Sequence, residues 1–295
     1  MMESITILER ARQFIYNNAR LIDRQRFSYF FEDGSQDAVL KALQAYQNAD
    51  GGFGNGLEPD IRCPHSQPVP TEVALHTMDA IGAIDTKIMD GIFRYLEHIT
   101  LKEGGLPLAF RNLLDFPHAP WWNIESDDIA SLNPTGNIVA LLLKLKVGPD
   151  LLKEAWFSRN AEYVWQSIEH REPTEYHDVV QWISFLEQAP DQARAIPVKK
   201  RLDEWLAKPG VIERDPYAEG YVQKVLDYVS SPTSYARKFV TDEEIELHLD
   251  ALIEQQQEDG GWLISFPETS SIAGLEWRGS LTVDRLVTLR AFGRI

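Results

Sequence analysis

The feature that most constrains the fold is an internal repeat. The segment Gln47-Asn-Ala-Asp-Gly-Gly-Phe53 recurs as Gln256-Gln-Glu-Asp-Gly-Gly-Trp262, 209 residues further along the chain. The match continues downstream, where Thr71, Leu75, Thr77, Ala80 and Gly82 correspond to Thr282, Leu286, Thr288, Ala291 and Gly293. A weaker third copy runs from Tyr95 through a Gly104-Gly105 turn to a segment that opens at Thr135. Such copies are typical of helix pairs stacked side by side.

Each copy follows one plan: a helix, a Gly-Gly turn, an aromatic residue, an extended connection and an apolar helix. The glycines permit the positive φ angles that a reversal of the chain needs. We expect Phe53 and Trp262 to occupy equivalent positions against their preceding helices, with both rings buried. Gln47 and Gln256 then have structural roles rather than catalytic ones.

Hydrophobic periodicity predicts an all-α protein, because apolar residues recur at helical spacing and alternating strand patterns with Asn-Gly or Asp-Gly turns are absent. The predicted helices cover 4–18, 36–49, 71–84, 87–100, 134–146, 151–170, 175–188, 192–207, 216–229, 241–258 and 281–293. Segment 134–146 is apolar all round, so we expect it to be buried on every side, whereas 87–100 and 241–258 each have one apolar face.

Alternating apolar and two-faced helices predict an α/α toroid of about five to six helix pairs, formed as a single domain by residues 1–295. The inner ring of this toroid would include 71–84, 134–146 and 281–293.

Composition excludes several classes of partner. The chain has 295 residues, of which 44% are hydrophobic, so it can bury a sizeable core. Its formal charge of −16 disfavours binding to nucleic acid and to anionic lipid surfaces. The longest apolar stretch, 138–143, is far below the roughly 20 residues of a membrane span. Glu3 and Glu9 stand where a signal peptide would be basic and then apolar, so we expect a cytoplasmic protein.

The Gln…Asp-Gly-Gly-Phe/Trp element resembles the QW-type repeat of squalene-hopene and oxidosqualene cyclases and of protein prenyltransferase β subunits. Both families are α/α toroids of the terpenoid cyclase superfamily. The resemblance therefore implies the same fold and a small hydrophobic substrate or ligand of the isoprenoid class. Because prenyltransferase β subunits work with a second chain, it also implies a partner subunit or a homo-oligomer.

The connections that follow the Gly-Gly turns predict the position of a ligand site. They are about 22 and about 30 residues long, and long ordered loops are more often functional than idle. In a ring of helix pairs they emerge at one end. We expect a pocket there, bordered by polar and aromatic residues. The expected substrate-binding residues are Glu58, Asp60, Trp121, Trp122, Trp277 and Arg278, with His65, Asp127 and Glu276 on the same rim.

The segment 125–130, Glu-Ser-Asp-Asp-Ile-Ala, is similar to the Asp-x-Asp-Asp-Thr-Ala element of class II terpene cyclases. Carried over by position, the resemblance makes Asp127 the acid that protonates an isoprenoid double bond. Asp128 and Glu125 would hold that acid protonated and oriented. The neighbouring tryptophans would face developing carbocations. A structural role is the alternative, in which these acidic residues cap a short helix.

Two other functions stay open. Helix-pair toroids also include glycan hydrolases and lyases, and Glu58 or Asp60 opposite Asp127 would be the acid/base pair of such an enzyme. An open polar groove favours a sugar, whereas a deep apolar pit favours an isoprenoid. The second alternative is a non-catalytic module that binds a hydrophobic ligand or a partner. An Asp127 that caps a helix amide would favour the binding module over catalysis.

We expect no metal and no cofactor. Asp60-Ile-Arg-Cys63-Pro-His65 spaces its Asp and Cys one residue too far apart for the zinc pattern of protein prenyltransferases. Asp60, Cys63 and His65 are nevertheless suitable zinc ligands, so a zinc site remains the alternative.

Overall fold

A computed structural model describes residues 6–148 and 150–295. The described chain is mostly helical, which confirms the all-α fold class, and it contains twelve α-helices and one pair of two-residue strands. It divides into two compact units. Unit 1 combines both ends of the chain, Met1–Val39 and Trp205–Ile295, and unit 2 is Leu40–Glu204.

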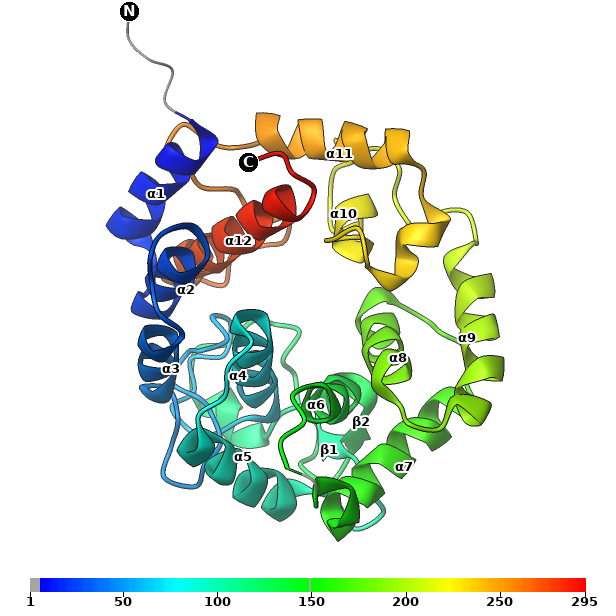
Figure 1. Cartoon of the computed structure of the whole chain (residues 1–295). Helices are drawn as coiled ribbons and strands as arrows, with labels where there is room; N and C mark the ends of the chain where they lie inside the picture. The colour runs from blue at the N-terminus through cyan, green and yellow to red at the C-terminus, as the bar shows by residue number, and fades with distance from the viewer. Residues whose placement is uncertain (1–5, 149) are drawn as a thin grey trace, which may run out of the picture. The chain divides into compact units, whose positions relative to one another are not determined.

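Unit 2 is built from two layers of helices (Figure 1). The first layer contains α4 (Pro68–Ile81), α6 (Leu132–Lys144) and α8 (Tyr176–Gln188). The second layer contains α5 (Thr86–Ile99) and α7 (Ala155–Glu169), followed by α9 (Gln192–Leu206), which crosses into unit 1. In the first layer, α6 packs against α4 and α8, and it also contacts α7. The burial of α6 follows from its sequence, since Ile138, Val139 and Leu142 face three neighbours.

Unit 1 joins the first helices of the chain to the last. Its long helices are α1 (Ile7–Asn18), α2 (Leu21–Phe31), α11 (Asp242–Glu254) and α12 (Ser271–Ala291), while α10 (Val225–Tyr228) is a single turn. Helix α12 packs against α1 and α2, and α10 packs against α11. Arg26 on α2 forms an ion pair of 2.6 Å with Asp284 on α12. The first two helices of the chain thus pack against its last helix. Helix α3 (Gln36–Gln44) crosses the boundary between the units.

Several elements differ from the sequence-based expectation, among them α2, α12 and α10. Helix α2 was not expected, because its aromatic run lacks a helical period. Helix α12 begins at Ser271 rather than at 281, since the Ser270 side chain accepts a hydrogen bond from the Ala273 amide and caps it. The helix expected over 216–229 is reduced to α10, because residues 216–224 form turns and Gly220 has a φ of 84°.

The repeat is confirmed at the level of individual hydrogen bonds. The Gln47 Nε2 group donates to the carbonyls of Gly51 (2.9 Å) and Ile88 (3.0 Å), which ties its turn to α5. The Gln256 Nε2 group likewise donates to the carbonyls of Gly260 (2.9 Å) and Ile7 (2.9 Å), which ties its turn to α1.

The aromatic residues of the two copies also correspond. The Phe53 and Trp262 amides donate to the hydroxyls of Thr71 (3.1 Å) and Thr282 (3.3 Å), and both rings are buried. In addition, the Trp262 indole donates to the Leu252 carbonyl of its own preceding helix. The equivalent positions predicted for the two rings are therefore confirmed.

Candidate functional site

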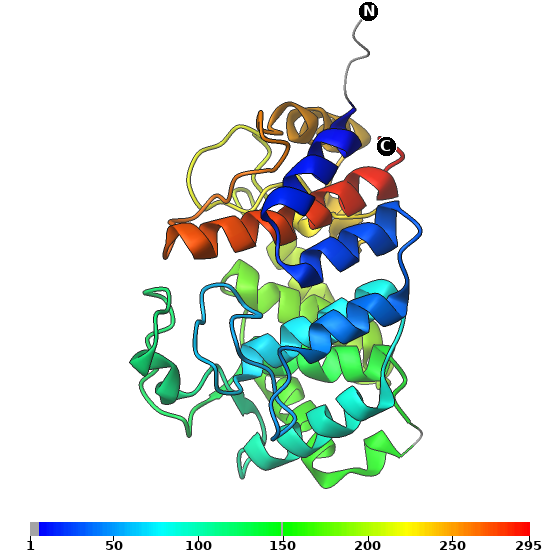
Figure 2. The ribbon, with the colours of Figure 1, turned by 90° about the vertical axis from the view of Figure 1, so that its left-hand side faces the viewer.

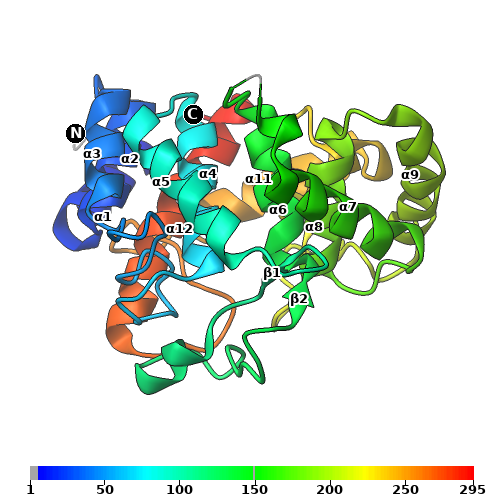
Figure 3. The same ribbon diagram turned by 90° about the horizontal axis from the view of Figure 1, so that it is seen from below.

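The two long connections of unit 2 lie together at one end of its helices (Figures 2 and 3). The Arg62 amide donates to the Pro117 carbonyl, and the Ala119 amide donates to the Asp60 carbonyl, both at 3.0 Å. Beneath these bonds the connections share a small apolar core formed by Ile61, Cys63, Val69, Ala109, Leu113 and Ile124. This core makes the loops a fixed platform.

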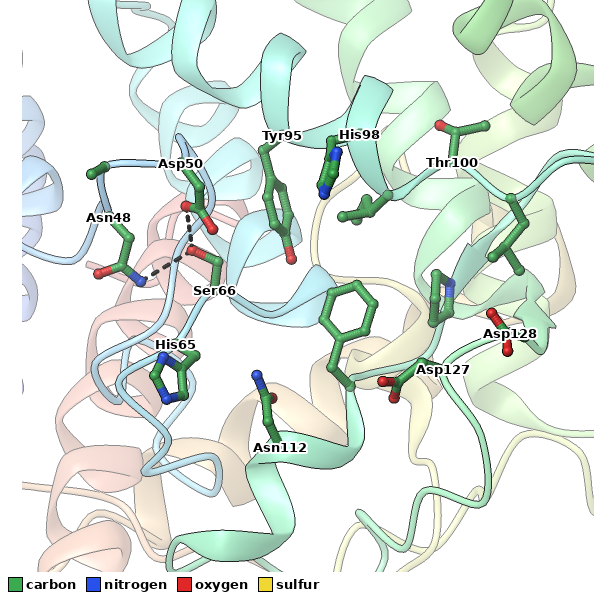
Figure 4. Close-up of a pocket in the computed structure, with 15 residues that line it drawn as sticks. Asn48, Asp50, His65, Ser66, Tyr95, His98, Thr100, Asn112, Asp127 and Asp128 are labelled. Atoms are coloured by element: carbon green, nitrogen blue, oxygen red, sulfur yellow. Dashed lines mark hydrogen bonds between the residues drawn. The ribbon is translucent and has the colours of Figure 1, made fainter.

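A cavity of about 690 Å³ opens where these connections meet the Gly51-Gly52 turn and the last turn of α5 (Figure 4). Its polar lining consists of Asn48, Asp50, His65, Ser66, Tyr95, His98, Thr100, Asn112, Asp127 and Asp128. Its apolar lining includes Pro107 and Phe110. The lining mixes carboxylates, amides, hydroxyls and imidazoles with apolar side chains, so the cavity is not a purely apolar pit.

Asp50 lines the cavity with a carboxylate of which only Oδ1 has hydrogen bonds among the described residues. Its Oδ1 atom accepts hydrogen bonds from the Gly52 amide (3.0 Å) and from the Ser66 hydroxyl (2.7 Å). The Asn48 side chain in turn donates to the Ser66 oxygen at 3.1 Å. These bonds fix the carboxylate and leave Oδ2 as an oriented acceptor.

Tyr95 is the most unusual side chain of the site. It comes from α5, only 4% of its surface is exposed, and its hydroxyl has no hydrogen-bond partner among the described residues. Figure 4 shows the hydroxyl directed into the cavity between Asp50 and Asn112. Burial, and secondarily the charge of Asp50, raise the pKa of Tyr95 well above its ordinary value. The phenol therefore keeps its proton at neutral pH and is available as a donor.

Asn112 adds a second donor. The buried Gln67 side chain donates to Asn112 Oδ1 at 2.6 Å, and Gln67 Oε1 accepts from the Phe110 amide at 2.7 Å. Because its oxygen is already bonded, Asn112 turns its NH2 group toward the cavity (Figure 4).

In the second copy of the repeat, an arginine side chain covers the equivalent turn. Phe14 lies seven residues after Ile7, as Tyr95 lies seven residues after Ile88, and each ring packs on the second glycine of its turn. In that copy Arg278 donates to both carboxylate oxygens of Asp259, at 2.7 and 2.8 Å. Its guanidinium also lies 4.6 Å from the centre of the Phe14 ring.

The copy with the cavity therefore differs from its counterpart in two respects. A tyrosine hydroxyl replaces a plain ring, and Ser66 replaces the arginine that closes the turn. As a result, Tyr95 and Ser66 both line the cavity.

The residues of the acidic motif lie on the outer edge of the site. Asp127 and Asp128 line the cavity and are exposed, and Glu125 is exposed nearby. Asp127 Oδ1 accepts a 2.6 Å hydrogen bond from the amide of Arg111, the first residue of the short helix η1 (Arg111–Asp115). This geometry matches the capping alternative.

None of the six predicted substrate-binding residues lines this cavity. Glu58 and Asp60 are buried in the first connection. Trp122 packs against the loop core, and Trp121 is 46% exposed. Trp277 and Arg278 lie on α12 of unit 1, where the Arg278 donors are used within their own turn. A concavity shared by all these residues stays a prediction.

The side chains of Cys63 and His65 lie in different surroundings. The Cys63 thiol is buried in the loop core, where burial raises its pKa, while His65 lines the cavity and contacts Phe116 edge to face. Within residues 6–148 and 150–295, no group of three or more His, Cys, Asp or Glu side chains is placed to hold a metal ion.

Asp50, Ser66, Tyr95, His98 and Asn112 were not expected as site residues. The signal for Tyr95 was present in the sequence, since aligning segment 7–18 with 88–99 pairs it with Phe14. No family model matches the chain, and the comparison with curated proteins finds no match. Evidence for the function of this site therefore comes from its geometry.

Proposed function

We propose that the Tyr95 cavity binds a neutral, hydroxyl-rich small molecule of the carbohydrate class. The observation that carries the proposal is the buried Tyr95 hydroxyl, which faces the cavity without a hydrogen-bond partner among the described residues. A buried hydroxyl left unsatisfied costs about 1–3 kcal/mol, and a ligand that accepts its hydrogen bond removes that cost.

The arrangement of donors and acceptors supports a sugar. Asp50 offers an oriented acceptor, whereas Tyr95 and Asn112 offer donors. Sugar hydroxyls both donate and accept, so they can satisfy such a mixed set. Phe110 adds an apolar surface for the C–H face of a ring. The volume of about 690 Å³ is in the range of small-molecule sites.

The charge of the lining argues against an anionic ligand. Asp50, Asp127 and Asp128 place three carboxylates around the cavity, which repel a diphosphate. Acid-initiated isoprenoid cyclisation also gains less support, because Asp127 is exposed and bonded to a backbone amide rather than enclosed by aromatic rings. A polar binding site is the alternative that this geometry favours.

We further infer that the helices close into an α/α toroid of the cyclase and prenyltransferase type. Three findings support this. The repeat keeps the same hydrogen bonds in both copies, unit 2 has two layers of helices, and unit 1 is assembled from both ends of the chain. The family assignment itself rests on the QW-type resemblance.

A binding screen with matched ligands tests the proposal. Wild-type protein is applied to an array of neutral oligosaccharides and, separately, to vesicles that contain squalene or farnesyl diphosphate. We expect selective retention of a glycan, lost in Asp50→Asn and kept in Glu103→Gln, which changes the corresponding residue of the third turn. Binding to the isoprenoid vesicles without any glycan binding would contradict it.

A further inference from the structure

A second cavity, of about 270 Å³, lies in unit 1 and uses none of the residues of the Tyr95 cavity. It is formed by α10, α11, α12 and the segment 255–265. The repeat aromatic Trp262 lines it, and four titratable side chains reach it: Lys224, Asp227, His248 and Arg285.

Arg285 is the group that the surrounding protein leaves unsatisfied. It projects from α12, and its buried Nε–H group donates to no acceptor among the described residues. Burial lowers the pKa of Arg285, and attraction from Asp227 and Asp284 only partly offsets this effect. A guanidinium carries five N–H donors and stays charged in proteins. Buried charges are normally paired, and among the described residues nothing accepts a hydrogen bond from this Nε–H group, so an added anion can pair with the guanidinium.

The other titratable groups are already engaged or neutral. Lys224 Nζ donates to the Pro216 carbonyl at 2.7 Å, and its amide is capped by Asp227 Oδ2 at 2.7 Å. His248 Nε2 donates to the Arg214 carbonyl at 3.0 Å, and burial lowers its pKa, so the ring is neutral at pH 7. The lining therefore carries two cationic side chains and one carboxylate, in a chain whose formal charge is −16.

We propose that this cavity binds a small carboxylate anion, with the ligand carboxylate paired to the Arg285 guanidinium. Planar carboxylates match the two-pronged geometry of a guanidinium. Lys224, directly before α10, adds positive charge, and Trp262 with Leu252 gives an apolar surface for a short carbon chain. The volume of about 270 Å³ suits an acid of a few carbon atoms.

The test uses succinate against succinamide, its neutral counterpart of nearly the same shape, at matched ionic strength. Calorimetric titration and thermal unfolding are measured on the full chain. We expect one succinate per chain and a rise in Tm, and no effect of succinamide. Arg285→Met should weaken succinate binding at least tenfold while raising the Tm of the ligand-free protein, because it removes a buried unpaired charge. Lys208→Gln, which removes an exposed charge of the same unit, should bind as the wild type does.

Three results would overturn the proposal. Equal effects of succinate and succinamide would exclude recognition of charge. Unchanged succinate binding in both Arg285→Met and Arg285→Lys would exclude the guanidinium, and the second variant covers the case in which the first fails to fold. Saturable binding of inorganic phosphate without binding of succinate would exclude the carboxylate.

Discussion

At the scale of single residues, the copies of the repeat are most informative where they differ. Phe14 and Tyr95 occupy the same place on equivalent turns, but only Tyr95 has a hydroxyl, which is buried at the wall of a cavity. The acidic motif was the more conspicuous signal in the sequence, yet Asp127 bonds a backbone amide. A linear motif specifies residue types, whereas exposure and hydrogen-bond partners come from the loops that fold around it.

The unsatisfied hydroxyl gives a prediction about stability. Tyr95→Phe should leave the free energy of unfolding unchanged or raise it by about 1 kcal/mol, because no hydrogen bond is lost and a buried polar group is removed. Tyr163→Phe, at the corresponding place of the third turn, is the control. Urea unfolding measures both. A marked loss of stability in Tyr95→Phe would mean that the hydroxyl already has a partner.

At the scale of elements, periodicity located most helices but missed those shaped by tertiary contacts. Helix α6 was predicted because its apolar residues surround it. The first half of α12 was not, since Gly274 and Gly279 lower helix propensity. A Cβ atom at Gly279 would come within 2.9 Å of the Ala19 side chain, so close packing explains this glycine. A contact between residues so far apart cannot be inferred from local sequence.

The Gly-Gly turns predict large effects of small substitutions. A Cβ atom at Gly51 would lie 2.0 Å from the Gly91 carbonyl oxygen, and the φ of Gly51 is +96°. Gly51→Ala should therefore cost about 3 kcal/mol or more. Gly82→Ala is the control, with positive φ but no atom within 4 Å, and should cost about 1 kcal/mol. Denaturant unfolding measures the loss of stability in both variants. Equal losses in Gly51→Ala and Gly82→Ala would show that the close approach of Gly51 to α5 does not affect stability.

The contact between α7 and α9 predicts a dependence on pH. Hydrogen bonds from Arg194 lower the pKa values of Glu162 and Glu169 below their usual 4.5. A carboxylate whose pKa is lowered by folding stabilises the folded state at pH values above its pKa in the unfolded chain. This contribution is lost as the pH falls through its pKa in the folded state. Because both glutamates are partly exposed, we expect their ion pairs with Arg194 to contribute about 1 kcal/mol to the free energy of unfolding at pH 7.

The variant Arg194→Gln isolates this contribution. Its stability deficit relative to the wild type should shrink between pH 7 and pH 3, since protonated glutamates gain little from Arg194. The part that persists at pH 3 includes the lost packing of Arg194 on the Trp165 ring, 4.6 Å away. A deficit that does not change with pH would argue against the ion pairs.

At the scale of the whole molecule, the sequence predicted the helical class, and the structure adds a division into two units. The described part of unit 1 covers residues 6–39 together with those from Trp205 onward, a pairing that no local sequence pattern predicts. Helix α12 contacts both α1 and α2. No helix within the described ranges is long and apolar enough to cross a membrane.

The composition of unit 1 can be tested by native-state hydrogen exchange in rising denaturant. Amides of α1 and α12 should open with the same free energy although they lie at opposite ends of the chain, because each buries the other's apolar face. Exchange of α1 at a much lower free energy than α12 would mean that the first helix frays independently.

If the Tyr95 cavity recognises a sugar, the Tyr95 hydroxyl donates a hydrogen bond to it. Saturation-transfer difference NMR with a panel of neutral mono- and disaccharides at millimolar concentration tests it most directly, since the method detects weak binding. We expect saturation transfer to at least one saccharide in the wild type and in Tyr163→Phe, and its loss in Tyr95→Phe. Transfer of equal strength in Tyr95→Phe, or none to any saccharide in the wild type, would contradict it.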